Sequence, residues 1–578
     1  MKEDLFMKEL TRRGFLGTAA AGLAGAGVLM SSGCAPSTPA SAGAEDELAA
    51  TGAPASDWLG EPPTISEDEI AGQIDTELLV IGAGNVGLTA AVHGCQNGLD
   101  VVLCEKTTGH GHTPGWIGAV NTKYHEQAGI TVDKGKLLNE AVRYASGKCD
   151  QSVWNVWINE SAAMIEWLED FMKPQGGYTM LDTEGYGDPT GGTDYYVQPL
   201  EHTLYTANGE LIAEQRGDFY EEYLNSQGVE ISYEHCLVKL IREGEKEGRV
   251  TGGIFQTPEG YVQVNASKGV LLATGGYAAN PTMIRALNPV IPACVTGTSF
   301  LPSLTGDGIK AGMWVGAKKD LEPAAMIFDR GVVPNGVDAG YTDDGPDAAF
   351  PGNTTFMIGS QPVLKVNRRG KRFANESCPY DFMTHAATHQ PGGVYALVFD
   401  SGLWDDFKRF HTIGCSKFLG TYWLEPNNGD IDAAFAQEIE QGLMQRADTI
   451  EELADQLGFT GSDKDNFLAE VERYNELYDK QVDEDFGKEA YRLSEIRRPP
   501  YYGAWNGGLL LTTIDGLCIN SDMQVLDESN EVIEGLYAAG DCQGSMFSGN
   551  YPEYIVGCAN GRGITFALHA VKHIAGLI

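Results

Sequence analysis

Basic side chains are scarce in this sequence. The chain has 40 Lys and Arg residues against 80 Asp and Glu, a formal net charge of −40 at pH 7. A surface this acidic repels phosphate backbones, so nucleic acid is not expected as a partner. The 11 cysteines form no CxxC, CxxCH or ferredoxin spacing. We therefore expect no metal site, haem or iron–sulfur cluster held by this chain itself.

Long apolar runs are also absent. The longest, Gly17–Met30, is too short for a comfortable membrane span. The remaining composition, with 42% hydrophobic residues in 578, is that of an ordinary globular protein. This excludes a mainly disordered, collagen-like or multi-span membrane protein. A chain of this length predicts two or more domains.

The N-terminus reads as an export signal. The pair Arg12 and Arg13 precedes the apolar run Gly17–Met30, and together they resemble a twin-arginine (Tat) signal. Such signals export proteins that are already folded, which suits a protein that must first acquire a cofactor. Residues 31–34, SSGC, resemble a lipobox without its usual Leu. We expect the mature protein at the extracytoplasmic face of the membrane, and a lipid anchor at Cys34 stays an open alternative.

Residues 35–73 separate this signal, residues 1–34, from the rest of the chain. They are rich in Ala, Ser, Pro and acidic residues and show no clear periodicity. This composition is typical of a disordered tether.

A dinucleotide-binding fingerprint follows the tether. The strand pattern at 76–81 runs into GAGNVG at 82–87, then into a helical stretch, a second strand at 101–104 and an acid, Glu105. Gly82 allows the tight turn, Gly84 lets the backbone approach a pyrophosphate, and Gly87 lets helix and strand pack closely. Glu105 is expected to accept hydrogen bonds from the adenosine ribose.

Two later segments favour FAD over NAD. A short strand at 534–539 ends in Gly540 and Asp541, and another at 270–273 ends in Thr274 and Gly275. In two-dinucleotide-type flavoproteins the late strand returns to the first domain, and its acid binds the ribityl chain. The sequence therefore predicts FAD as the cofactor.

At this point the chain resembles the soluble fumarate reductase and 3-ketosteroid dehydrogenase family of FAD enzymes, from about Ile74 to the C-terminus. The resemblance rests on the motifs above and on further segments. These are Gly306–Ile309 with Gly316-Ala317, Val366–Glu376, Val471–Asn475 with Asp485–Gly487, Pro499–Tyr502, Asp515–Leu517 and Gln524–Asp527.

The resemblance implies an α/β fold. A Rossmann-like FAD-binding domain, a parallel sheet with helices, is formed by residues 74–279 and 498–578, and an inserted α+β capping domain by residues 280–497. The substrate then lies between them. The cofactor-binding residues it implies are Gly82, Gly84, Asn85, Gly87, Glu105, Lys106, Val238, Thr274, Gly275, Asp307, Gly540 and Asp541.

The expected substrate site departs from the fumarate reductases. Their acid Arg falls at Tyr380, a His-Pro-Thr segment is matched by residues 328–330, and an Asn-Arg segment reads Asn-Tyr at 550–551. A site for two carboxylates needs fixed cations. Without them fumarate is a poor candidate, although Arg330 remains for one anionic group.

Tyr551, followed by Pro552, instead resembles the ketosteroid dehydrogenase branch. We predict Tyr380 and Tyr551 as catalytic proton donors, with Arg372 and Arg330 assisting, and Phe547 and Tyr554 as substrate contacts. Each tyrosine has an alternative role as a core aromatic whose hydroxyl bonds a backbone carbonyl. Arg372 has an alternative structural role in supporting the cap hinge.

These residues predict an exported FAD-dependent oxidoreductase acting on CH–CH bonds. It would reduce an activated C=C bond, an enoate or enone, of a small organic acceptor, with hydride from flavin N5 and a proton from a tyrosine. A membrane-bound cytochrome or quinol dehydrogenase would supply electrons in anaerobic respiration. The alternatives are a 3-ketosteroid-type dehydrogenase and a non-catalytic electron-carrier flavoprotein.

Replacing both Arg12 and Arg13 with Lys should retain the FAD-loaded protein in the cytoplasm, because the arginine pair is the recognised part of the signal. Cell fractionation with flavin absorbance measures this. Cys34→Ala serves as the comparison, since it tests only the anchor. Full export of the double-Lys protein would contradict the twin-arginine assignment.

Overall fold

The computed structural model describes residues 58–578 apart from 184–194, 213–214, 245, 300 and 418–423. The described residues belong to one compact unit that begins at Pro54. The predicted signal, Cys34 and most of the predicted tether lie outside them. Within these ranges, no helix has both the length and the apolar character needed to cross a bilayer.

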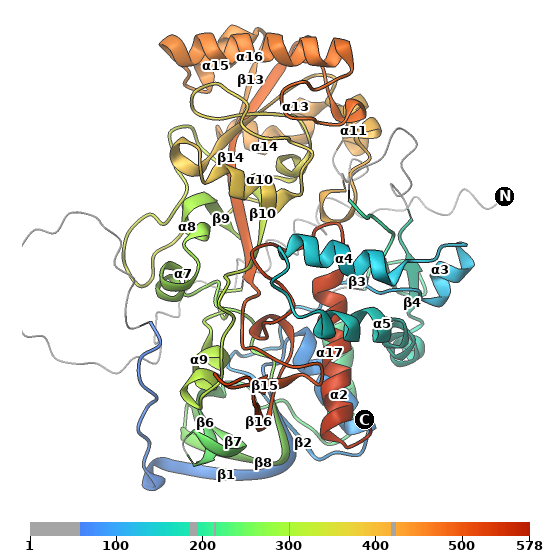
Figure 1. Cartoon of the computed structure of the whole chain (residues 1–578), viewed down its shortest axis with the longest axis vertical. Coiled ribbons are helices and arrows are strands. Elements are labelled where there is room, and N and C mark those ends of the chain that lie inside the picture. The colour runs from blue at the N-terminus through green and yellow to red at the C-terminus, as the bar shows by residue number, and fades with distance from the viewer. Residues whose placement is uncertain (1–57, 184–194, 213–214, 245, 300, 418–423) are drawn as a thin grey trace, which may run out of the picture. The chain divides into compact units, whose positions relative to one another are not determined.

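A seven-stranded sheet holds the predicted nucleotide-binding half (Figure 1). Its central strands β1, β2, β8 and β16 are parallel, and β15, β6 and β7 extend it in antiparallel pairs. The strands are β1 (Ile70–Ile81), β2 (Val101–Cys104), β6 (Cys236–Gly244), β7 (Glu247–Thr257), β8 (Gly260–Leu272), β15 (Gln524–Leu526) and β16 (Val532–Ala538). A parallel sheet with covering helices confirms the predicted α/β class.

The register brings the parallel strands to an end in one row. Ile81 is paired with Cys104 and Leu272, and Leu272 with Ala538. The turns that follow these residues must therefore meet at the same edge of the sheet, where open parallel sheets bind ligands.

The start of β1 corrects the predicted tether. Residues 70–73 were expected to be disordered, but they form the first part of β1 and pair with residues 261–263 of β8. Backbone hydrogen bonds to the long β7–β8 hairpin offset the polar composition on which the expectation of disorder rested.

A second, six-stranded sheet is centred on β14 (Tyr501–Thr513), which pairs with four neighbouring strands. Side chains alternate between its two faces, so Val332 and Val333 belong to different apolar clusters. The other strands are β9 (Val295–Thr298), β10 (Ala325–Val333), β11 (Leu364–Val366), β12 (Tyr395–Asp400) and β13 (Met444–Ala447). The central strand β14 begins after residue 497, where the predicted capping domain ends. The division into domains stays a prediction.

Helices complete both sheets, and a small third sheet of β3 (Trp116–Gly118), β5 (Glu201–Tyr205) and β4 (Tyr178–Leu181) lies beside them. The helices are α2 (Asn85–Gln96), α3 (Lys123–Gln127), α4 (Lys134–Tyr144), α5 (Gln151–Met172), α6 (Gln215–Ser226), α7 (Pro281–Leu287), α8 (Val290–Cys294), α9 (Asp307–Trp314), α10 (Tyr380–Ala387), α11 (Leu403–Phe410), α13 (Ile431–Ala434), α14 (Ala436–Glu440), α15 (Ile450–Gln456), α16 (Gly461–Lys480) and α17 (Cys558–Ile574).

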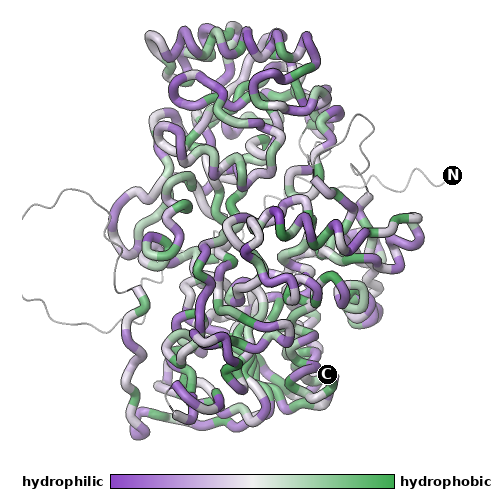
Figure 2. The backbone as a smooth tube through the Cα atoms, viewed as in Figure 1, coloured by the Kyte–Doolittle hydropathy of each residue, from purple (hydrophilic) through white to green (hydrophobic). Residues whose placement is uncertain are grey.

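In helix α16 the spacing of the apolar residues determines which side chains are buried. Phe467, Val471, Tyr474 and Leu477 recur at helical spacing and are its buried residues. Along the same helix the tube in Figure 2 alternates between hydrophobic and hydrophilic residues. One face therefore packs on the second sheet while the other is solvated.

Helix α17 approaches β3 through glycines. The Gly118 N–H donates to the Gly557 carbonyl at 2.8 Å. A Cβ at Gly561 would lie only 1.9 Å from the Gly118 carbonyl oxygen. This close approach of helix and strand needs a hydrogen atom at position 561.

Gly561→Ala should lower the free energy of unfolding by about 1–3 kcal/mol, because helix and strand must separate to admit the methyl group. Gly563→Ala is the matched control in the same helix: its nearest neighbour is a methyl group of Val86 at 2.9 Å, which can move. Both gain the same helix propensity. Equal thermal unfolding midpoints for the two variants would contradict the close packing.

Candidate functional site

The glycine loop at the end of β1 has the shape that a dinucleotide needs. Gly82 has φ of +101°, and a Cβ there would meet the Ala273 carbonyl at 2.5 Å. A Cβ at Gly87 would lie 1.7 Å from the Gly82 carbonyl oxygen. Gly84, the N-cap of α2, has nothing within 4 Å of its Cβ position. The loop is therefore tight on its protein side and open where a diphosphate would approach α2.

Glu105 ends β2 and anchors this loop. Its carboxylate accepts from the Ala83 N–H at 2.8 Å and from the Thr107 N–H and hydroxyl at 2.9 and 2.8 Å. These protein contacts hold the glycine loop against β2. Each carboxylate oxygen has two lone pairs, so the predicted role toward a ribose stays a prediction that the contacts allow.

Other predicted cofactor residues lie along the same edge. Lys106 donates to Thr305 and pairs with Asp307, both at 2.6 Å, which ties the end of β2 to the start of α9. Val238 sits where the pairing of β6 with β7 shifts register, so a bulge leaves it out of the ladder. Thr274 follows β8, and its hydroxyl is buried beside the Cys542 thiol. Its neighbour Gly275 has φ of +70°.

The C-terminal turn completes this edge. Gly540 has φ of +76°, and its Cβ position is 2.8 Å from a methyl group of Val86 in α2. Asp541 forms an ion pair of 2.5 Å with the buried Arg562 of α17. The strand ends at residues 81, 104, 272 and 538 thus bring the turns at 82–87, 105–106, 274–275 and 540–541 to one edge, and the Lys106–Asp307 ion pair adds the start of α9.

Tyr380 opens α10 and is 1% exposed. Its backbone N–H donates to Glu553 at 2.7 Å, and its ring meets Phe328 edge-on at 4.8 Å. Its hydroxyl has no hydrogen-bond partner among the described residues. Burial, with the nearby Cys415 and Tyr551, raises the pKa of Tyr380 well above its ordinary value. This hydroxyl holds its proton firmly and has no structural task.

The other two predicted tyrosines have structural contacts. The Tyr551 hydroxyl accepts from the Ala559 N–H at 3.1 Å, and its ring packs against Phe547. The Tyr554 hydroxyl donates to the Ser377 carbonyl at 3.1 Å. Tyr554 therefore has the core-aromatic arrangement, whereas Tyr551 accepts one hydrogen bond and keeps its own proton.

Arg330, a residue of β10, lies beside the residues around Tyr380. Its Nε donates to Ser360 at 2.7 Å, another nitrogen bonds the Cys415 carbonyl, and its guanidinium covers the Phe328 ring. Neighbouring Asp329 pairs with Lys365 at 2.7 Å. The structure thus brings Arg330 to the residues that surround Tyr380.

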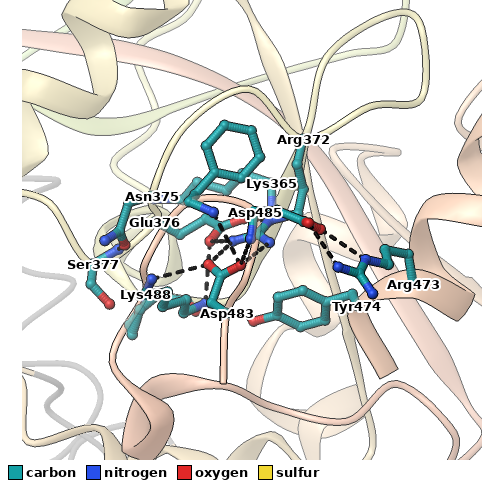
Figure 3. A network of polar contacts seen from close by, with 12 residues as sticks. Lys365, Arg372, Asn375, Glu376, Ser377, Arg473, Tyr474, Asp483, Asp485 and Lys488 are labelled. Atoms are coloured by element: carbon teal, nitrogen blue, oxygen red, sulfur yellow. Dashed lines mark hydrogen bonds and ion pairs between the residues drawn. The ribbon is translucent and has the colours of Figure 1, made fainter. Parts of the chain in front are cut away.

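Arg372 is not part of that group. It pairs with Glu376 through Nε and Nη2 at 2.9 Å and with Asp483 at 2.9–3.1 Å (Figure 3). Burial alone would raise the pKa of Glu376, but Lys488 and Arg372 lower it. All three nitrogens of Arg372 are committed, so its contacts support the structural alternative rather than catalysis.

Two buried acids next to Tyr380, Glu553 and Asp381, were not predicted as site residues from the sequence. Glu553 is 2% exposed. Burial raises its pKa to about 7, although hydrogen bonds from Ser416 and the Tyr380 N–H lower it. Asp381 is fully buried, and burial together with Glu553 raises its pKa well above its ordinary value. The available signal was an acid inside the apolar run 551–556.

Tyr144, at the end of α4, also approaches this group. Its buried hydroxyl has no partner among the described residues, and its pKa, raised mainly by burial, is raised further by Tyr554, Asp381 and Glu553. No feature of the sequence near residue 144 pointed to it.

A cavity of about 20 Å³, enough for one water molecule, adjoins Glu553. Its polar lining includes Ser377, Ser416, Arg492 and Glu553. A larger hollow of about 360 Å³ lies beside α16 and contains none of the predicted site residues. No cluster of three or more His, Cys, Asp or Glu side chains in the described ranges could hold a metal ion.

Comparison with known proteins agrees with this geometry. The FAD binding domain family matches residues 77–554. The chain belongs to this family. It is an FAD-dependent oxidoreductase of the class that acts on CH–CH bonds, and the resemblance to fumarate reductases and 3-ketosteroid dehydrogenases is confirmed.

Two relatives and one solved structure show the extent of the similarity. Vinyl phenol reductase of Lactiplantibacillus plantarum is 27% identical over 515 residues, 86% of this chain and 96% of that protein. NADH:acrylate oxidoreductase of Vibrio harveyi is 25% identical over 82% of this chain, which spans only 48% of that protein. The structure of 3-ketosteroid delta1-dehydrogenase from Sterolibacterium denitrificans has a TM-score of 0.66 at 20% identity, covering 87% of this chain and all of that one.

The edge residues fit FAD. The open face of Gly84 at the start of α2, together with Gly82 and Gly87, would hold the diphosphate, and the turn at Gly540 and Asp541 would face the ribityl side. The contribution of each residue stays a prediction.

The raised pKa of Glu553 gives a test by pH. The folded state keeps this proton up to about pH 7, whereas an unfolded Glu loses it near pH 4.3. Between these values the folded state binds more protons, so its stability falls as pH rises, by about 4 kcal/mol at most. Glu553→Gln mimics the neutral acid, so its unfolding midpoint should fall less between pH 5 and pH 8. Parallel pH curves for both proteins would mean that Glu553 is ionised in the fold.

Proposed function

We propose that this protein is an exported reductase that saturates an activated C=C bond of a small organic acceptor. The observation that carries the proposal is the buried Tyr380 hydroxyl, which has no hydrogen-bond partner within the described ranges and lies beside Tyr551 and two acids. Bound FAD supplies hydride exchange with a carbon–carbon bond. Reduction then requires a fixed proton donor, and this hydroxyl has no other task.

The surroundings of Tyr380 suit proton donation to a strong base. Burial, with Cys415, Tyr551, Glu553 and Asp381, keeps its pKa high. It therefore stays protonated at neutral pH and releases the proton only to a carbanion-like carbon, whose conjugate acid is weaker still. Asp381 and Glu553 are the adjacent acids from which the proton can be replaced, and the cavity beside Glu553 has room for a bridging water.

The charges of the site favour a substrate other than a dicarboxylate. Arg330 is already hydrogen-bonded to Ser360 and to the Cys415 carbonyl, and Lys365 is paired with Asp329. Glu553 and Asp381, whose pKa values are raised by burial, offer no positive charge to a second carboxylate. We propose an uncharged or singly charged acceptor whose C=C bond is conjugated with a carbonyl or a phenol. Similarity to vinyl phenol reductase over most of both chains supports this class.

The electron donor lies outside this chain. We propose that a membrane-bound cytochrome or quinol dehydrogenase reduces the flavin, so that the protein acts as a terminal reductase in anaerobic respiration. The arginine pair near the N-terminus supports export, and Cys34 would anchor the protein to the membrane if it is lipidated.

A 3-ketosteroid-type dehydrogenase is the second candidate. It is supported by the second tyrosine, Tyr551, whose hydroxyl keeps its own proton close to Tyr380. Two such hydroxyls could polarise a ketone and exchange a proton with the neighbouring carbon. A purely electron-carrying flavoprotein would have no use for a buried hydroxyl without a partner.

Tyr380→Phe keeps the ring and removes only the hydroxyl. Turnover should fall at least a hundredfold, as general acid catalysis typically contributes about 10²–10⁴. The assay follows anaerobic reoxidation of reduced flavin by enoates, enones and alkenyl phenols. FAD content and flavin reduction by an artificial donor should be unchanged.

Tyr395→Phe is the matched control. Tyr395 is equally buried, and its hydroxyl lies 3.2 Å from the Asn506 amide in the second sheet. Wild-type turnover in Tyr380→Phe would remove it as the proton donor. If Tyr551→Phe alone abolished turnover, the ketosteroid-type arrangement would be favoured instead.

A further inference from the structure

Arg216, in the first turn of α6, is a completely buried cation that forms no ion pair with any carboxylate of the described residues. Its Nη2 donates to the Asn85 side-chain oxygen at 2.6 Å and to the Pro114 carbonyl at 3.0 Å. Nε and Nη1 have no hydrogen-bond partner, and no described carboxylate forms an ion pair with it. Burial lowers its pKa.

Such an arrangement is unfavourable for the protein alone. A buried charge is normally paired, because an unpaired one loses its hydration without compensation. Arg372 and Arg562 each face a carboxylate within 3 Å, and Arg492, which is buried among backbone carbonyls, donates from all three of its nitrogens. Among the described residues Arg216 meets two neutral oxygens and the Tyr220 ring, and it keeps unused N–H groups on two nitrogens.

The position of Arg216 indicates which kind of ligand could balance its charge. Its partner Asn85 is the first residue of α2, directly after Gly84, whose Cβ position has open space around it. The first N–H groups of a helix have no partner within the helix, and the helix dipole favours an anion there. The guanidinium and the helix start therefore place two positive features at one point.

We propose that Arg216 is the counter-ion of an anionic diphosphate, that of the bound FAD. The anion would take the free Nε–H and Nη1–H groups, while Asn85 holds the third nitrogen against the start of α2. Arg216 thereby makes loading and stability interdependent, because the fold carries an uncompensated charge until the cofactor arrives. This inference depends on FAD binding alone and not on the identity of the acceptor.

The competing explanation is that Arg216 only clamps Asn85 to the Pro114 carbonyl. The two roles predict opposite effects of Arg216→Met, which keeps an apolar side chain of similar length. If Arg216 is a counter-ion, the variant without FAD is at least as stable as the wild type, because the buried charge is gone. If it is a clamp, the variant is less stable at every FAD concentration.

The experiment uses the holoprotein and two readouts besides activity. Free-flavin fluorescence after dilution measures FAD release, and thermal unfolding is followed at a series of added FAD concentrations. We expect Arg216→Met to bind FAD roughly ten- to a hundredfold more weakly, the effect of losing hydrogen bonds to a charged group. Arg216→Lys keeps the charge but not the paired donors, so its affinity for FAD should lie between those of the wild type and Arg216→Met.

The unfolding midpoint at the lowest FAD concentration decides between the roles. A midpoint equal to or above that of the wild type, with weaker FAD binding, supports the counter-ion. FAD release within twofold of the wild type overturns it. Weaker binding with a midpoint that is also lower at the lowest FAD concentration overturns it too, because Arg216 would then act through the fold. Arg372→Met, which leaves Glu376 and Asp483 unpaired, supplies the reference for that loss.

Discussion

The parallel pairing of β1 with β8, and of β8 with β16, is the constraint on which the site depends. Because Ile81, Leu272 and Ala538 lie in one row, the turns after them reach the same edge of the sheet. Those turns are tight enough to exclude a Cβ at Gly82 and Gly87. A slip of one residue in any pair would turn the buried side chains to the other face and separate the turns.

Buried charge is distributed unevenly over this framework, and the difference carries information. Arg372 is surrounded by carboxylates from residues that lie far apart in sequence, so its charge is satisfied by the protein. Arg216 is equally buried but meets only neutral oxygens, and Glu553 avoids charge by keeping its proton. Side chains of the first kind hold the fold together. Arg216 and Glu553 instead have a charge or a proton that can interact with a ligand or take part in a reaction.

Local motifs could be predicted from the sequence because they depend on near neighbours. The strand, glycine loop, helix and second strand between residues 70 and 104 follow the fingerprint, although β1 begins at Ile70 rather than at 76 and α2 already begins at Asn85, inside the glycine motif. Partnerships across the fold could not be predicted. Arg216 meets Asn85 over 131 positions, and Tyr380 meets Glu553 over 173. Arg372 was placed with the catalytic residues because its partner Asp483, 111 positions away, is invisible to a motif.

The order of strands in the first sheet also bears on biosynthesis. The nucleotide edge takes its first turn from residue 82 and its last from residue 540, so nearly the whole chain is made before β16 can pair with β8. Until then the end of β8, residues 270–272, lacks its partner on that side, and the turn that ends in Asp541 does not exist. A ribosome-bound or truncated chain therefore has the glycine loop but not a complete cofactor site. A complete cofactor edge therefore requires the chain to extend at least to Asp541, because its last turn follows β16.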